Sequence, residues 1–125
     1  MSDAKRFKKL LPLTPPVFHI LLALTDADRH GYGIMQEVSL QTRGEIRLGP
    51  GTLYGCLKRM QASGLVEESE QRPVADLDDE RRRYYRVTEM GQCVVRAEAN
   101  RLAEALQAAT AKLLVSVVNR PTRKG

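Results

Sequence analysis

The chain has no tryptophan, and its 125 residues include two phenylalanines and four tyrosines, so it offers little surface to a large aromatic ligand. Its two cysteines, Cys56 and Cys93, lie far from each other and from both histidines, which excludes a zinc site of recognisable Cys/His spacing. The longest apolar run, Ile20 to Leu24, is far too short to span a membrane. The first residues are charged and polar and lack the apolar core of a signal peptide, so we expect a cytoplasmic protein.

The sequence also lacks the groupings of side chains that catalysis requires. No candidate nucleophile is paired with a base, and no two carboxylates share a helix face. The acidic run from Asp76 to Glu80 is followed directly by arginines that neutralise it. Residues 31–33 begin like a nucleotide-binding loop, but Gln36 stands where the third glycine belongs and no strand precedes them. We therefore expect no enzyme, no metal and no cofactor.

Positive charge is what the chain has in excess. The net charge is +5 and the isoelectric point is near 9.5, which favours an anionic partner without specifying its kind. Hydrophobic residues make up 42% and charged residues 28%, as in an ordinary globular protein, and the length suits one compact domain.

The segment from Pro50 to Ser63 predicts a short helix whose two ends are marked. Pro50 suits the first helical position, and Gly64 suits the left-handed residue that ends a helix. One face is apolar and is predicted to pack on a core; its members are Leu53, Cys56, Leu57 and Met60. We expect Cys56 and Cys93 to be buried, reduced thiols; a redox-sensing Cys56 is the alternative.

The opposite face of this helix is small and cationic, and no carboxylate occurs from Pro50 through Val66. Its members are Gly51, Thr52, Gly55, Lys58, Arg59 and Ala62, with Tyr54 on the flank. Lysine and arginine on a helix are most often simply solvated. The other interpretation is a helix that reads the major groove of DNA, where small residues and free amide groups allow close approach to phosphate.

The neighbouring patterns favour the second interpretation. Thr14 and two prolines begin an apolar helix at 17–25, and a second, amphipathic helix follows at 32–42. Residues 45–48 predict at most a marginal edge strand, and residues 65–70 and 82–87 predict a long β-hairpin. The fold class is therefore mainly α with a small β-hairpin, in the order of a winged helix-turn-helix.

Thr88 begins a last helix, predicted over 89–118, that is too long for one small core to cover. Its apolar stripe follows coiled-coil spacing through Val95, Ala99, Leu102, Leu106, Ala109 and Leu113. The stripe either packs on the chain's own domain or forms a subunit interface, and we prefer the interface because the earlier helices already supply a core.

We expect four parts in the chain. Residues 1–12 form a basic arm, either helical or a frayed end; residues 13–88 form the winged helix-turn-helix DNA-binding domain; residues 89–118 form the dimerisation helix; and residues 119–125 form a disordered basic tail.

With these elements in place, the sequence from about residue 13 to residue 114 resembles the PadR family of bacterial transcriptional regulators, in the small subgroup with one C-terminal helix. The shared motifs are Leu13-Thr14-Pro15, His30-Gly31-Tyr32-Gly33-Ile34, Pro50-Gly51-Thr52-Leu53-Tyr54, Gly64-Leu65-Val66 and Arg82-Arg83-Tyr84-Tyr85-Arg86-Val87-Thr88. The resemblance implies a homodimer that binds a partly palindromic operator in double-stranded DNA, usually as a repressor, and that releases it on a small-molecule or other signal. Gly55 departs from the family, whose members often carry proline or a larger residue there.

From the helix face and the resemblance together, we expect DNA to be contacted by Tyr32, Gly51, Thr52, Tyr54, Lys58, Arg59, Arg81 and Arg82. An inducer, if one exists, is expected as a small phenolic or similarly apolar molecule at the subunit interface, near Phe7, Phe18, His19 and Met90. His19 is otherwise read as a rim histidine of the core. The alternative function is a winged-helix interaction module that binds an acidic protein partner through residues 50–63.

Overall fold

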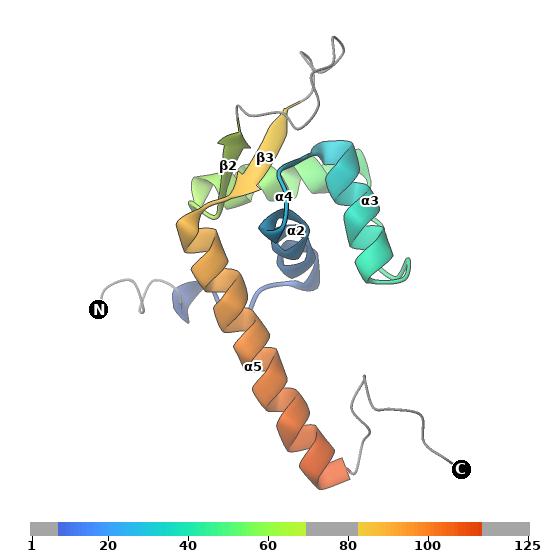
Figure 1. Ribbon diagram of the computed structural model, residues 1–125, viewed down its shortest axis with the longest axis vertical. Helices are drawn as coiled ribbons and strands as arrows, with labels where there is room; N and C mark the ends of the chain where they lie inside the picture. The colour runs from blue at the N-terminus through green and yellow to red at the C-terminus, as the bar shows by residue number, and fades with distance from the viewer. Residues whose placement is uncertain (1–7, 70–82, 114–125) are drawn as a thin grey trace.

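The computed structural model describes residues 8–69 and 83–113. Its elements are α2 (Pro15–Thr25), β1 (Arg29–His30), α3 (Gly31–Gln41), α4 (Pro50–Ala62), β2 (Val66–Ser69), β3 (Tyr84–Val87) and α5 (Glu89–Leu113), and residues 8–10 add a short helical turn (Figure 1). The predicted fold class is confirmed: helices dominate, a small antiparallel sheet follows α4, and a long helix ends the described chain. No helix within these residues is long and apolar enough to cross a membrane.

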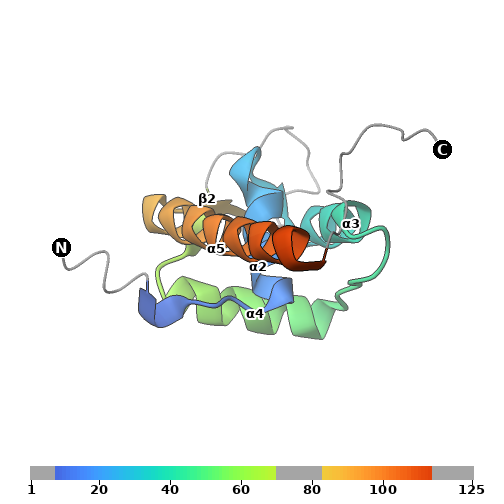
Figure 2. The same ribbon diagram turned by 90° about the horizontal axis from the view of Figure 1, so that it is seen from below.

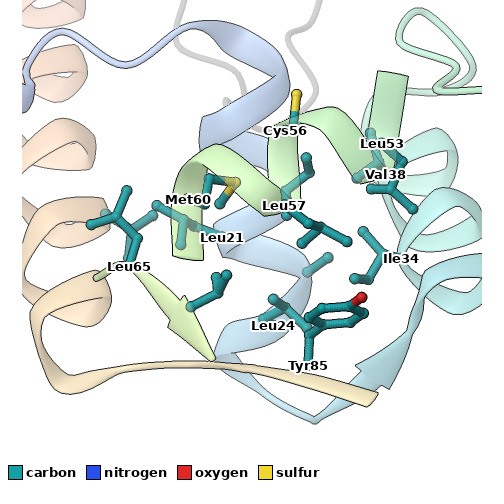
Figure 3. Close-up of a cluster of buried hydrophobic side chains, with 14 of the residues drawn as sticks. Leu21, Leu24, Ile34, Val38, Leu53, Cys56, Leu57, Met60, Leu65 and Tyr85 are labelled. Carbon is teal, nitrogen blue, oxygen red and sulfur yellow. The ribbon is translucent and has the colours of Figure 1, made fainter. Parts of the chain in front are cut away.

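Helix α2 is the centre of the core. The Thr14 hydroxyl accepts a hydrogen bond from the Val17 amide at 3.4 Å, and Pro15 takes the first helical position. Ile20 and Leu21 are fully buried, and α2 contacts α3, α5 and β3. Figure 3 shows the side chains of α2, α3 and α4 converging there, with Tyr85 of β3 closing one side.

The third strand of the sheet, β1, lies at a place where the sequence predicted no strand. The strand order is β1-β3-β2, and both pairings are antiparallel. Tyr84 of the central strand β3 lies opposite His30 of β1 on one side and opposite Ser69 of β2 on the other. The marginal strand expected at 45–48 is wrong. The Thr42 hydroxyl accepts from the Ile46 amide at 3.0 Å, so this connection satisfies backbone groups locally, and the edge of β3 pairs with Arg29–His30 instead.

Helix α3 is followed, after its C-cap Thr42, by two left-handed residues, Arg43 and Gly44, with φ of 53° and 80°. The Gly44 amide donates to the Ser39 carbonyl at 2.7 Å, which satisfies an orphan carbonyl of the last turn. This compact stop turns the chain so that α4 begins only a few residues later. The helix-turn-helix arrangement of α3 and α4 follows from it.

Helix α5 packs on the domain with its first half only. Gly91 lies so close to the Leu65 carbonyl that an added Cβ would collide with it, which lets the start of α5 pack against the backbone just before β2. The buried residues of α5 are Gly91, Val94, Val95 and Glu98, and the helix beyond them extends away from the other elements (Figure 1). Residues 114–118, which complete the predicted helix, lie outside the described residues.

A buried carboxylate fixes the N-terminal segment to α5. Glu98 is 2% exposed and accepts from Arg101 Nη2 at 2.7 Å and Nε at 2.9 Å, and from the Leu13 amide. The hydrogen bond from Arg101, aided by that of Leu13, lowers the pKa of Glu98 although burial opposes the shift. The Glu98 carboxylate therefore connects the start of α2 to the middle of α5.

Candidate nucleic-acid interface

Helix α4 presents an uncapped and open N-terminus. Its N-cap residue, Gly49, has no side chain to bond the first amides, and Pro50 occupies the first turn. A Cβ on Gly49 or on Gly51 would meet nothing within 4 Å. Thr52 is exposed beside them. Free amide groups at a helix N-terminus attract phosphate, and the small residues here leave the approach unobstructed.

The two cations of α4 point in different ways. Both are exposed, but the guanidinium of Arg59 turns back along the helix and donates to Cys56 Sγ at 3.6 Å. Within residues 8–69 and 83–113, no ion pair joins either cation to a carboxylate. The cationic face therefore keeps its charge, and Lys58 is the more direct probe of a polyanion.

Tyr54 links α4 to the start of α3. Its phenol occupies the position that a Cβ on Gly31 would take, and it remains 46% exposed. Tyr32, the next residue of α3, is 62% exposed. The structure thus brings two exposed tyrosines, far apart in sequence, to neighbouring positions at the N-terminal ends of α3 and α4.

His30 orients the start of α3. Its Nδ1 accepts from the Gly33 amide at 3.1 Å, which places the proton of the neutral ring on Nε2. The ring stacks on Tyr32 with centroids 6.4 Å apart and meets Tyr84 edge-on at 5.2 Å. Helix α3 is therefore capped by a side chain, in contrast to α4, whose N-cap residue makes no side-chain hydrogen bond.

The described part of the wing carries neutralised arginines. Arg86 Nε lies 2.8 Å from a Glu67 oxygen, and Arg83 Nη1 lies 3.3 Å from a Glu68 oxygen. These pairs are solvent-exposed and add little stability, but they reduce the positive charge of the strands. The expected DNA contacts Arg81 and Arg82 lie outside the described residues.

The apolar stripe of α5 divides into a buried and an exposed part. Val95 is 6% exposed and belongs to the chain's own core, so its prediction as a subunit contact is corrected. Leu102 and Leu106 are 41% and 40% exposed, and Leu113 is 68% exposed. Ala99 is exposed and Ala109 half-buried. From Ala99 onward the stripe offers small and apolar side chains that the described part of the chain leaves largely uncovered.

Of the residues expected around an inducer, the structure describes Phe18, His19 and Met90. Phe18 and His19 meet edge-on with ring centroids 5.3 Å apart, and Gln41 Nε2 donates to the His19 carbonyl at 2.8 Å. Burial lowers the pKa of His19, which fits a rim histidine of the core. Met90 lies instead near Gly64, where a Cβ would be 3.8 Å from its sulfur. Phe7 lies outside the described residues.

Sequence reasoning passed over two cations in the connection before α4. Arg43 and Arg47 are both exposed, and Arg47 Nε donates to the Gly44 carbonyl at 3.2 Å. Their position just before Pro50 could have marked them as candidate DNA contacts, since the connection in a helix-turn-helix lies beside the helix that enters the DNA groove.

An open, cationic second helix, a preceding helix packed against it and a hairpin beyond it define a winged helix-turn-helix, a class of DNA-binding domain. The family model for the transcriptional regulator PadR-like family matches residues 20–97, and the chain belongs to this family. It is a transcriptional regulator that acts through DNA binding, and it is not an enzyme.

A relative supports this family, and solved structures support the fold. Transcriptional regulator Rv3488 of Mycobacterium tuberculosis is 41% identical over 86 residues, which cover 69% of this chain and 74% of that protein. A PadR family transcription regulator from Clostridium difficile superposes with a TM-score of 0.65 at 24% identity, over 80% of this chain and 99% of that one. A PadR-like transcriptional regulator from Bacillus cereus gives a TM-score of 0.64 at 19% identity, over 90% and 99%. These two structures support the fold.

Proposed function

We propose that the chain is a homodimeric repressor that binds a partly palindromic operator through α4 and releases it in response to a signal. The observation that carries the proposal is the face of α4: an uncapped N-terminus, small residues and two cations without a carboxylate partner among the described residues. On this assignment Gly51, Thr52 and Tyr54 approach the DNA backbone, and Lys58 reaches a phosphate or a guanine edge.

The dimer is supported by the exposed part of the α5 stripe. A helix that extends beyond its own core with Leu102, Leu106 and Leu113 exposed leaves an apolar strip in water, which pairing with a second copy removes. Small Ala99 permits close approach of the two helices. Residues 13–88 then bind DNA, and residues 89–118 hold the subunits together. In such a dimer the two copies of α4 must lie about 34 Å apart to enter successive major grooves.

Release of the operator would follow from any change in that spacing. A small apolar molecule between the subunits, near Phe18 and His19, would act on α2, which packs against α5 and α3. Both side chains are half-buried in the single chain. A shift of α5 on α2 would move the two reading helices without touching the DNA face.

The test is selection of bound duplexes from random DNA with purified protein, followed by anisotropy titration of the selected sequence at increasing potassium chloride. The proposal expects an enriched inverted repeat, two chains per duplex, and a logarithmic affinity that falls by about 0.9 per logarithmic unit of salt for each phosphate contacted. Failure to enrich any sequence, with only weak retention of random DNA, would contradict the proposal and favour a module for an acidic protein partner.

A further inference from the structure

Helix α5 is hydrogen-bonded to the DNA-binding domain at two points. The first point is the start of the helix, where the Thr88 hydroxyl donates to the Gly64 carbonyl at 2.6 Å and accepts from the Gly91 amide at 2.9 Å. The Thr88 amide also donates to the Leu65 carbonyl at 3.0 Å. Because Gly64 and Leu65 directly follow α4, this point joins the start of α5 to the end of the helix proposed to read DNA.

The second point is Glu98, the last buried residue of α5. Its carboxylate accepts from the Leu13 amide just before α2, and Arg101, whose side chain is 46% exposed, covers it with two hydrogen bonds. Figure 2 shows α5 running over α2, with which it is in contact. Beyond Glu98 the helix extends away from the domain, so Glu98 lies where α5 leaves it (Figure 1).

Between these two points the packing of α5 is apolar. Val94 and Val95 are buried there. Apolar contacts are not directional, whereas hydrogen bonds have a preferred distance and angle. A buried ion pair is weak evidence for stability, and its best-known use is to select one geometry among several. The hydrogen bonds of Thr88 and Glu98 therefore set the angle between α5 and the domain that carries α4.

A small displacement at Glu98 has a large effect on α4. Thr88 and Glu98 are ten positions apart, or about 15 Å along the helix, so a displacement of about 1 Å at Glu98 rotates the domain by about 4° against α5. Helix α4 has 13 residues and ends beside Thr88, which places its N-terminus about 20 Å from that point. The N-terminus then moves by about 1.4 Å, and the two subunits of a dimer change their separation by up to about 3 Å. The rise of one base pair is about 3.4 Å.

We infer that Glu98 is a positioning residue that determines which spacing of operator half-sites the dimer accepts. Its carboxylate is buried and acts through the joint between α5 and the domain, by holding α5 at the angle at which both copies of α4 reach their major grooves. The inference rests on the proposed function, because it needs the α5 dimer and an operator of two half-sites. Loss of the carboxylate should leave the reading of a single half-site intact and relax the required spacing between two.

The spacing is tested on the selected inverted repeat and on versions with one base pair added or removed between the half-sites. One base pair moves a half-site by about 3.4 Å and turns it by about 34° around the DNA axis. The wild type should prefer the selected spacing at least about tenfold. In Glu98→Gln this preference should fall at least about threefold, while the affinity for a single half-site equals that of the wild type. The control is Glu104→Gln, at an exposed position of the same helix, which should keep both values.

A second variant separates the hydrogen bonds of Glu98 from its packing. Glu98→Met keeps an unbranched buried side chain and removes both the charge and the acceptor of the Leu13 amide. It should relax the spacing at least as much as Glu98→Gln does, and circular dichroism shows which variants are folded at the temperature of the measurement. An unchanged spacing preference in a folded Glu98 variant overturns the inference. An equal loss of affinity for half-site and full operator also overturns it, because that result shows general damage to the DNA-binding domain.

The angle itself is measured without DNA. Ketone-bearing residues in place of the exposed Gln61 on α4 and Gln107 on α5 carry two spin labels and leave both cysteines unchanged. Labelled chains are diluted with unlabelled ones, so that pulsed electron paramagnetic resonance reports the distance within one chain. The distribution of that distance should be at least about twice as wide in Glu98→Gln as in the wild type, and unchanged in Glu104→Gln. Equal widths in wild type and Glu98→Gln overturn the inference. If no inverted repeat is selected, the proposed function fails, and this distance still decides whether Glu98 fixes the angle of α5.

Discussion

The phenol of Tyr54 on α4 occupies the space that a methyl group on Gly31 of α3 would need. The Tyr54 oxygen lies closer to that position than any Cβ contact permits, and the ring carbon that bears it would be 2.7 Å away. Gly31 is itself buried at the first position of α3. The absence of a side chain at Gly31 therefore allows the Tyr54 ring to lie against the start of α3.

Gly31→Ala should lower the free energy of unfolding by about 1–3 kcal/mol, because Tyr54 has to leave its place. Urea denaturation measures the loss. The matched control is Gly51→Ala, where the added methyl meets open space and alanine favours the helix, so stability should not fall. In a Tyr54→Ala background the cost of Gly31→Ala should largely disappear. An undiminished cost in that background would show that Tyr54 is not the obstacle.

The Glu98 carboxylate predicts an acid-dependent loss of stability. Its pKa lies below the ordinary value of about 4.3 in the folded chain, because Arg101 and the Leu13 amide hydrogen-bond the charged form. Between the folded and the unfolded pKa the unfolded chain binds more protons, so the stabilisation is complete above the unfolded value and is lost as the pH falls through the folded one.

Glu98→Gln should remove this component. The difference in unfolding free energy between wild type and Glu98→Gln, measured with urea at fixed protein concentration, should be largest near pH 6 and should shrink towards pH 3. The exposed Glu104, on the same helix, provides the control: Glu104→Gln should change stability little at either pH. A wild-type advantage that is constant with pH would contradict the assigned role of the carboxylate.

The proposed dimer predicts that charge in the exposed stripe separates the subunits. Leu102→Glu with Leu106→Glu places like charges opposite one another, so sedimentation equilibrium should show a monomer that keeps its helical content. The control pair, Ala103→Glu with Gln107→Glu, adds the same charges at exposed positions one residue further along the helix. A wild-type chain that sediments as a monomer, or a charged-stripe variant that stays dimeric, would exclude this interface.

Much of the fold could be predicted because the ends of its elements are marked by residues whose chemistry is local. Thr14 with Pro15 begins α2, Pro50 begins α4, and Gly64, with φ of 81°, follows it. The change from helical to alternating spacing after Gly64 predicted the hairpin. Strand β1 could not be predicted, since two residues carry no periodicity, and they become a strand only because β3 offers an unpaired edge.

Features of the candidate site that depend on contacts between distant parts of the chain could not be predicted from the sequence either. The stripe of α5 runs without a break from Val95 to Leu113, and sequence spacing cannot show where the chain's own domain stops covering it. The structure sets that point after Glu98. The orientation of Arg59 towards Cys56 could not be predicted either, because residue spacing places a side chain on a helix face but does not fix its rotamer.

The most direct test of DNA reading by α4 is the operator affinity of Lys58→Ala, measured by anisotropy. The control is Lys112→Ala, which removes one exposed charge from the far end of α5. We expect Lys58→Ala to lose about 1–3 kcal/mol of binding free energy, with relaxed preference at one operator position if Lys58 reads a base and with a uniform loss if it contacts phosphate. Lys112→Ala should bind as the wild type does. Operator binding by Lys58→Ala at wild-type strength would contradict the assignment of α4 as the helix that reads DNA.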